Sequence, residues 1–193
     1  MLRASALGGS VGLLACACAS LAPTPITDNV ATAEVRNADG QVVGSATFTE
    51  VGGGVRLVLE MRGMPPGARA VHVHEVGKCE PPDFASAGRH LNPAGKRHGL
   101  LNPDGPHAGD LPNISIGPDG TGRLETMNDR LALRSGAALL DDDGSSLVVH
   151  AAPDDFMTDP DGGSGARIAC GVIVRSPTGP EHSVSSPART PAR

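Results

Sequence analysis

The sequence predicts an all-β protein, a sandwich or barrel of eight short strands. Three observations support this prediction. Short runs of residues alternate between apolar and polar side chains, as strands with one buried face do. The 193 residues include 26 Gly and 17 Pro, which provide turns between those runs. No stretch shows the periodicity of a long amphipathic helix.

Turn signals separate the expected strands. Asp39-Gly40 and Gly52-Gly53-Gly54 divide the first three runs, and Pro65-Pro66-Gly67 precedes the fourth. A long loop follows the fourth run, and Pro118-Asp119-Gly120 divides the fifth from the sixth. The expected strands are residues 32–36, 42–50, 55–61, 70–75, 114–116, 122–127, 147–150 and 168–174.

These strands form one expected domain, residues 31–175, between segments of different composition. Residues 1–22 have the pattern of an export leader, with Arg3 before a short apolar run. The leader is either a plain signal peptide or a lipoprotein leader lipidated at Cys16, which follows Leu13-Leu14-Ala15. We expect residues 23–30 to be a linker and residues 176–193, rich in Pro and Ser, to be a disordered tail.

Composition excludes some classes of partner. Acidic residues number 21 against 16 basic ones, a net charge of −5, which argues against a nucleic-acid-binding face. No apolar run is long enough to span a membrane, so any membrane attachment would be through a lipid at Cys16.

The loop of residues 86–110 carries His90, His98, His107 and Asp110. It is rich in Gly and Pro and buries little apolar surface, so something else must order it. Three imidazoles and a carboxylate make a full ligand set for a closed, structural zinc site. The alternative is a solvated loop with scattered histidines.

A second set of imidazoles lies in the expected strands. His72 and His74 are two residues apart, so both point to the same face of their strand, and His150 ends another strand. This pattern suggests a nitrogen-rich copper or zinc site, although alternation on a surface strand also explains it. Six histidines and Asp110 are seven ligands, whereas two four-coordinate sites need eight, so one imidazole would be shared. Spacing does not identify which one.

The two body cysteines and one arginine can each be interpreted as structural or as functional. Cys79 and Cys170 are expected to form a disulfide in an exported protein, and the alternative is two buried thiols. Arg167 stands in an otherwise acidic and Gly-rich segment, where it could dock a small anion. From the residues alone, an ordinary surface arginine is the better explanation.

The runs VHVHE, SAGRHLNP, HAGDLPN, VVHAAPDD and GARIACGVI closely resemble copper/zinc superoxide dismutases of the exported bacterial type, over residues 31–174. The resemblance implies a Greek-key, Ig-like sandwich or barrel with a long metal-binding loop and a second active-site loop. It implies two metal sites that share His90. Copper would be bound by His72, His74, His90 and His150, and zinc by His90, His98, His107 and Asp110.

The resemblance also implies the remaining roles. Asp154 would link a copper-ligand histidine to a zinc-ligand histidine, Arg167 would dock superoxide, and Cys79 and Cys170 would be the disulfide. Copper would cycle between Cu(II) and Cu(I) and convert superoxide to dioxygen and hydrogen peroxide. His90 would leave copper on reduction and take up a proton, so His90 and Arg167 are the expected catalytic residues.

The implied setting is antioxidant defence in the bacterial periplasm, or anchored by lipid in the cell envelope, with a homodimer as one option. One alternative is a non-catalytic copper- or zinc-binding protein of the same fold, and another is a structural sandwich. The chain departs from many relatives because residues 151–166 contain acids and no lysine. We therefore expect superoxide to be attracted by the metals and Arg167, helped by Arg89, Lys96 and Arg97.

Overall fold

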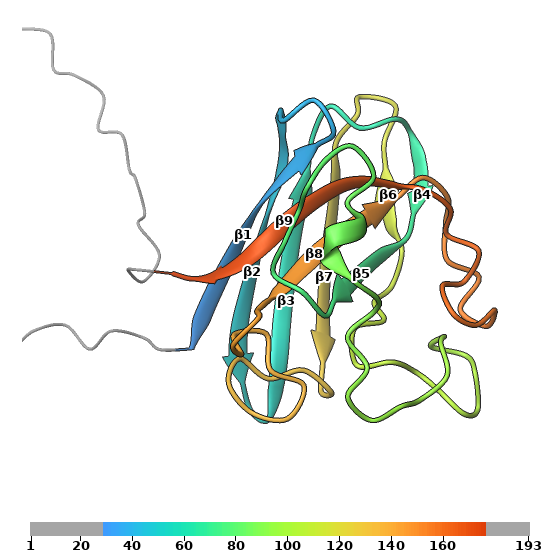
Figure 1. The fold of residues 1–193 in the computed structure, drawn as a ribbon. Coiled ribbons are helices and arrows are strands. Elements are labelled where there is room, and N and C mark those ends of the chain that lie inside the picture. Colours follow the sequence, from blue (N-terminus) through green and yellow to red (C-terminus); the bar gives the residue numbers. More distant parts are fainter. Residues whose placement is uncertain (1–28, 177–193) are drawn as a thin grey trace, which may run out of the picture.

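A computed structural model describes residues 29–176, and these form nine strands and one short 3-10 helix (Figure 1). The expected leader with Cys16, nearly all of the expected linker and the expected tail from residue 177 onward lie outside the described residues. In chain order the elements are β1 (Val30–Asn37), β2 (Val42–Val51), β3 (Gly54–Met61), β4 (Gly67–Arg69), β5 (Val71–His74), η1 (Ala85–Ala87), β6 (Ile114–Ile116), β7 (Gly122–Asn128), β8 (Ser145–His150) and β9 (Arg167–Arg175).

The strands make one antiparallel sheet in the order β4-β6-β7-β3-β2-β1-β9-β8-β5. Its two outermost strands, β4 and β5, are consecutive in the chain and separated only by Ala70. The sheet therefore curls until its edges meet and forms a nearly closed barrel. The links from β3 to β4, from β5 to β6 and from β7 to β8 join strands that are not neighbours, which confirms the expected Greek-key arrangement.

The expected count of eight strands is wrong by one. β4 is the additional strand, and it has only three residues, Gly67, Ala68 and Arg69, which pair with β6. None of them is fully buried, so this strand lacks the buried apolar residues by which the others were recognised. The expected strand at residues 70–75 is shorter in the structure, as β5.

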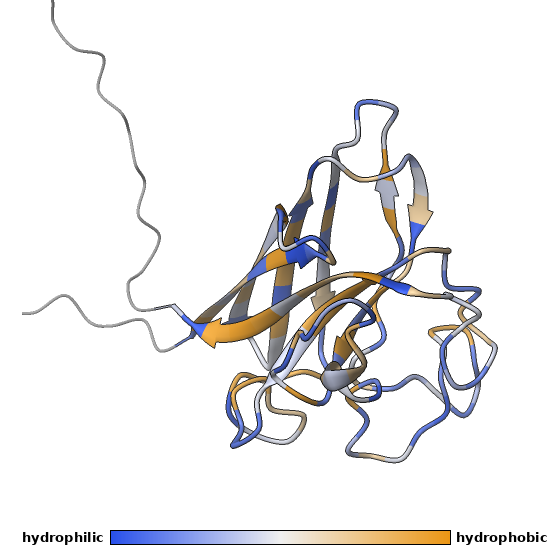
Figure 2. Cartoon of the chain, turned by 45° about the horizontal axis from the view of Figure 1, so that its top comes forward, coloured by the Kyte–Doolittle hydropathy of each residue, from blue (hydrophilic) through white to orange (hydrophobic). Residues whose placement is uncertain are grey.

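The barrel interior is filled by aliphatic side chains and Phe48. β2 and β3 show the alternation of buried and exposed residues that predicted them. In Figure 2 the strands carry most of the hydrophobic residues, whereas the long loops are mainly hydrophilic. The largest fully buried apolar side chains include Phe48, Leu57, Leu59, Leu111, Ile114, Leu133, Leu139 and Leu147. Within the described residues, no helix has the length and apolar composition to cross a membrane.

Two long connections lie on the outside of the barrel beside β5 and β8. The first, residues 75–113, contains η1 and is joined to β9 by the disulfide between Cys79 and Cys170, which confirms the expected pairing. The second, residues 151–166, connects β8 to β9. We call them the first loop and the second loop. They correspond to the predicted metal-binding loop and active-site loop.

Candidate metal centre

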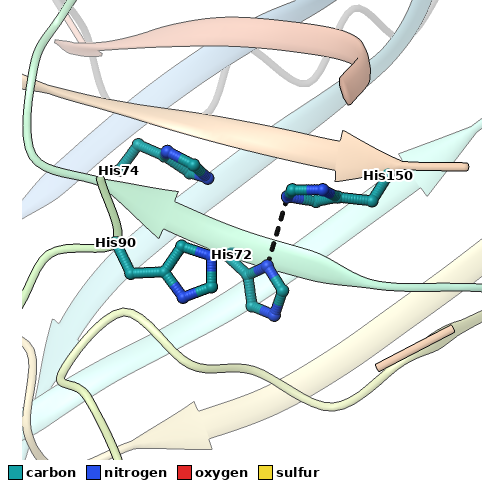
Figure 3. A group of neighbouring side chains, drawn as sticks. All are labelled: His72, His74, His90 and His150. Atoms are coloured by element: carbon teal, nitrogen blue, oxygen red, sulfur yellow. Dashed lines mark hydrogen bonds between the residues drawn. The ribbon is translucent and has the colours of Figure 1, made fainter. Parts of the chain in front are cut away.

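Three of the expected ligands come from the sheet. β5 pairs with β8 so that His72 lies opposite Val148 and His74 opposite Ser146. His72 and His74 share a face, as predicted, and His150 at the end of β8 lies beside them (Figure 3). All three side chains are buried. Nδ1 of His72 lies 3.2 Å from Nε2 of His150.

The first loop reaches this cluster because its main chain pairs with β5. The N–H of Val73 donates to the carbonyl of Gly109 at 2.9 Å, and the N–H of Leu91 donates to the carbonyl of Val73 at 2.9 Å. This pairing sets His90 opposite His74 and Asp110 opposite His72. The ring centroid of His90 then lies 4.0 Å from that of His72 and 4.9 Å from that of His74.

Each strand-borne imidazole is held through one nitrogen. His74 donates from Nδ1 to the carbonyl of Gly88 at 3.0 Å, and Nδ1 of His150 lies 3.2 Å from the carbonyl of Gly165. Nε2 of His72 lies 2.8 Å from Oδ2 of Asp154. The other nitrogen of each ring is left for the cluster, and Nε2 of His74 is buried with no hydrogen-bond partner. A buried nitrogen without a partner is rare, so this atom fits a metal ligand.

Burial keeps these imidazoles neutral. It lowers the pKa of His72 to about 3 and that of His150 to about 4. It also lowers the pKa of His74 well below its ordinary value, and that of His90. Because only the neutral ring has a free lone pair, this half of the centre can bind metal at neutral pH without first losing protons.

The other half is built around Asp110, which is buried. Nδ1 atoms of three histidines surround its Oδ1: His98 at 3.0 Å, His90 at 3.1 Å and His107 at 3.4 Å. Oδ2 accepts from the main-chain N–H groups of Gly99 at 2.8 Å and His107 at 2.9 Å. Three nitrogens and one carboxylate oxygen thus converge, as in a closed zinc site.

The charges in this half differ from those in the strand-borne half. Burial alone would raise the pKa of Asp110, but hydrogen bonds from His107, His90 and His98 hold it far below its usual range. Burial would lower the pKa of His98, but its hydrogen bonds to Asp110 and Asp154 raise it to about 9. His98 without metal is therefore protonated at neutral pH.

The two halves are contiguous. One group of ligand atoms within 4.8 Å of one another comes from His72, His74, His90 and His150, and another comes from His72, His90, His98 and Asp110. The groups have His72 and His90 in common. His107 borders the second group, with Nδ1 3.4 Å from Nδ1 of His90.

Asp154, in the second loop, joins the halves. Its Oδ2 lies 2.8 Å from Nε2 of His72 and its Oδ1 lies 3.0 Å from Nε2 of His98. Asn113 holds its main chain, accepting from the Asp154 N–H and donating to the Asp154 carbonyl, both at 2.9 Å. Such partners fix the orientation of ligand rings.

A cavity of about 520 Å³ opens onto the rings of His74, His90, His107 and His150. Arg167 lines it, and its two terminal nitrogens donate to the carbonyls of Phe84 and Gly88, each at 2.7 Å. The guanidinium is therefore fixed beside the imidazoles. The other charged residues in the lining are Arg89, Lys96, Glu75, Asp159 and Asp161, and Arg97 is not among them.

Sequence reasoning missed several residues that bring the loops together. A Cβ on Gly162 would lie 1.8 Å from Oδ1 of Asp154, and one on Gly99 would lie 2.1 Å from the carbonyl oxygen of Phe156. Asn128, buried at the end of β7, donates to the carbonyl of Ala108 at 2.9 Å and so supports the segment before Asp110. Nothing in the sequence distinguishes these two glycines from the other 24 of the 26.

Comparison with known sequences identifies the family. Residues 42–173 match the family described as copper/zinc superoxide dismutase (SODC). Copper/zinc superoxide dismutase 2 of Aquifex aeolicus is 48% identical over 149 residues, covering 76% of this chain and 87% of that protein. A copper/zinc superoxide dismutase of Caulobacter vibrioides is 52% identical over 147 residues, covering 74% and 84%.

Solved structures agree with the fold. A SOD-like protein from Bacillus subtilis superposes with a TM-score of 0.72 at 37% identity, covering 74% of this chain and 97% of that one. Cu/Zn superoxide dismutase from Brucella abortus superposes with a TM-score of 0.62 at 31% identity, covering 75% and 99%. With its histidine cluster and adjoining histidine–aspartate site, the chain belongs to the copper/zinc superoxide dismutase family of oxidoreductases.

Proposed function

We propose that this chain dismutates superoxide at a copper site and a zinc site that share one imidazole. Copper would be held by His72, His74, His90 and His150, and zinc by His90, His98, His107 and Asp110. The observation that supports this assignment most is the buried, unpartnered Nε2 of His74, beside a second set of donors converging on Asp110. Neutral imidazoles suit copper, and a closed set of three imidazoles and one carboxylate suits structural zinc.

We assign the shared ligand to His90, although His72 is also common to both groups. His72 has its Nε2 occupied by Asp154 at 2.8 Å, so only its Nδ1 is available to a metal. His90 presents Nδ1 to Asp110 at 3.1 Å while its ring lies against those of His72 and His74. This placement favours His90 as the ring with one nitrogen for each site.

Copper, when bound, supplies the electron transfer: one superoxide is oxidised to dioxygen, and a second is reduced and, with two protons, leaves as hydrogen peroxide. The residues of the chain bind the anion and handle a proton. Arg167, fixed by two carbonyls at the cavity wall, would dock superoxide next to the imidazoles. His90 would hold a proton on the nitrogen facing the copper half and pass it to the product.

The experiment is to load the purified protein with copper and zinc and to measure the disappearance of superoxide. His90→Ala should keep a folded, disulfide-linked barrel but lose the shared ligand, and its activity should fall to the uncatalysed background. If the replete protein is inactive at full copper occupancy, the chain is a non-catalytic copper- and zinc-binding protein of the same fold.

We also propose that residues 1–22 direct export to the periplasm or cell envelope. The disulfide supports this proposal because such bonds persist in oxidising compartments. The mass of the mature N-terminus distinguishes plain cleavage from lipidation at Cys16, and an intact N-terminus would contradict export. The linker, the C-terminal tail and a possible homodimer stay predictions, and sizing in solution gives the subunit count.

A further inference from the structure

We propose that Asp159 is a positioning residue for the zinc half of the centre, holding the main chain of His98 and the ring of His107 from the second loop. The inference rests on the proposed assignment of both histidines as zinc ligands. Sequence reasoning treated Asp159 only as one of several acids in this loop, which weaken the attraction for an anionic substrate.

The contacts of Asp159 are made by a single oxygen. Its Oδ1 accepts from the main-chain N–H of His98 at 2.7 Å and lies 3.9 Å from Nε2 of His107. The opposite nitrogen of that ring, Nδ1, lies 3.4 Å from Oδ1 of Asp110. Asp159 therefore stands at the outer side of the imidazole and Asp110 at the inner side.

This arrangement has a chemical consequence. A carboxylate beside Nε2 favours the tautomer that carries its proton there, although 3.9 Å is an electrostatic contact rather than a direct hydrogen bond. Nδ1 is then left with its lone pair, directed at the metal position. A carboxylate that accepts from the outer N–H of a ligand histidine fixes its tautomer and ring orientation, and the charge of Asp159 at 3.9 Å favours the same tautomer.

Asp159 complements Asp154 within the same loop. Asp154 is buried and connects His72 with His98, whereas Asp159 has 43% of its side chain exposed and connects His98 with His107. Together the two carboxylates extend from the second loop to both histidines that belong to the zinc half alone. The contacts of Asp159 with the zinc half thus explain an acid at the cavity wall, although its negative charge repels superoxide.

Asp161 provides a matched control. It lies two residues further along the same loop and lines the same cavity, and its side-chain Oδ1 accepts from the main-chain N–H of Gly163 at 3.2 Å. Replacing either aspartate removes one negative charge from the cavity, but only Asp159 contacts the zinc half. A difference between the two variants therefore reports position rather than net charge.

The experiment measures zinc affinity of the full disulfide-linked chain after removal of metals, by competition with a coloured zinc chelator. Asp159→Ala should weaken zinc binding by about 10-fold, the lower end of the range for outer carboxylates. Asp159→Asn should restore only part of the affinity, because its amide oxygen can accept from the His98 N–H but carries no charge for the ring of His107. Asp161→Ala should stay within about twofold of wild type.

Equal affinities for wild type and Asp159→Ala, or equal losses in Asp159→Ala and Asp161→Ala, would overturn the proposal. Asp110→Ala separates this failure from a failure of the ligand assignment. If Asp110→Ala binds zinc as tightly as wild type, the assignment itself is wrong.

A second measurement needs no variant. NMR of ¹⁵N-histidine-labelled wild type loaded with zinc should place the proton of His107 on Nε2, and a proton on Nδ1 would overturn the proposal together with the assignment of Nδ1 as the zinc ligand.

Discussion

The two halves of the metal centre are built by different parts of the fold. His72, His74 and His150 project from adjacent paired strands, β5 and β8, and burial, with repulsion from neighbouring rings, lowers their pKa values and keeps them neutral. The zinc-side residues stand on a long loop whose regular structure is limited to η1 and two isolated bridges, and they are held by carboxylates and close backbone contacts. The strand-borne half is therefore preformed by the sheet, whereas the loop-borne half depends on two loops holding each other.

The same ligand type therefore serves two purposes according to its surroundings. An imidazole with a pKa lowered by burial is already neutral, so it can bind metal at any pH above that pKa. His98, between Asp110 and Asp154, keeps a proton until metal replaces it.

The largest effect should come from removing one ligand from each half. His74→Ala should lose copper and fall to background activity, because its Nε2 is the buried donor of the strand-borne half. Asp110→Ala should lose zinc but keep copper, because the strands still present their imidazoles. Metal content by mass spectrometry checks both variants. Loss of both metals in both variants would mean that the halves are not separately built.

Crowding between the loops gives the next effect. Gly162→Ala would place a methyl group 1.8 Å from Oδ1 of Asp154, so the second loop must shift and the free energy of unfolding should fall by about 1–3 kcal/mol. Gly163→Ala is the matched control, since its φ of +65° is close to the +66° of Gly162 but a Cβ there meets nothing within 4 Å. Thermal or denaturant unfolding of the two variants gives the difference, and equal losses would refute the close-approach explanation.

Removing the charge that we propose docks the anion should slow turnover without releasing metal. Arg167→Ala should keep copper and lose about 10-fold in rate, since a hydrogen bond to a charged group is worth about 1.5–3 kcal/mol. Pulse radiolysis on samples of equal copper content measures the dismutation rate of both proteins. An unchanged rate would make Arg167 an ordinary structural arginine.

The pH dependence of metal binding should differ between the halves. Below the pKa of His98, about 9, zinc must displace a proton, so each unit of rising pH should strengthen zinc binding by up to about tenfold. His72 and His150, with pKa values of about 3 and 4, are already neutral, so copper affinity should change far less between pH 5 and 8. Separate titrations with each metal test this, and identical slopes would contradict it.

The smallest effect concerns attraction of the substrate. The rate should fall as salt rises, because the cations at the cavity act locally despite the net charge of −5. Lys96→Gln should flatten this dependence, whereas Arg97→Gln, outside the cavity lining, should leave it nearly unchanged. A rate that is flat or rises with salt in wild type would mean that the acids dominate.

The sequence predicted those features that depend on local pattern. Period-two alternation placed His72 and His74 on one face, and the family motifs pointed to the residues that the first loop brings together. It missed β4, whose three residues lack an alternating apolar pattern. It also missed Gly162, Asn128 and Asp159. Their importance arises from contacts between segments far apart in the chain, which no local sequence pattern encodes.

The central claim is that one imidazole, that of His90, joins two unlike metal sites. Diffraction from crystals of the copper- and zinc-loaded protein, recorded on either side of each metal's absorption edge, would locate each metal. Copper is expected among His72, His74, His90 and His150, with zinc on the other side of His90. Metals joined through His72, or separated with no common ligand, would contradict it.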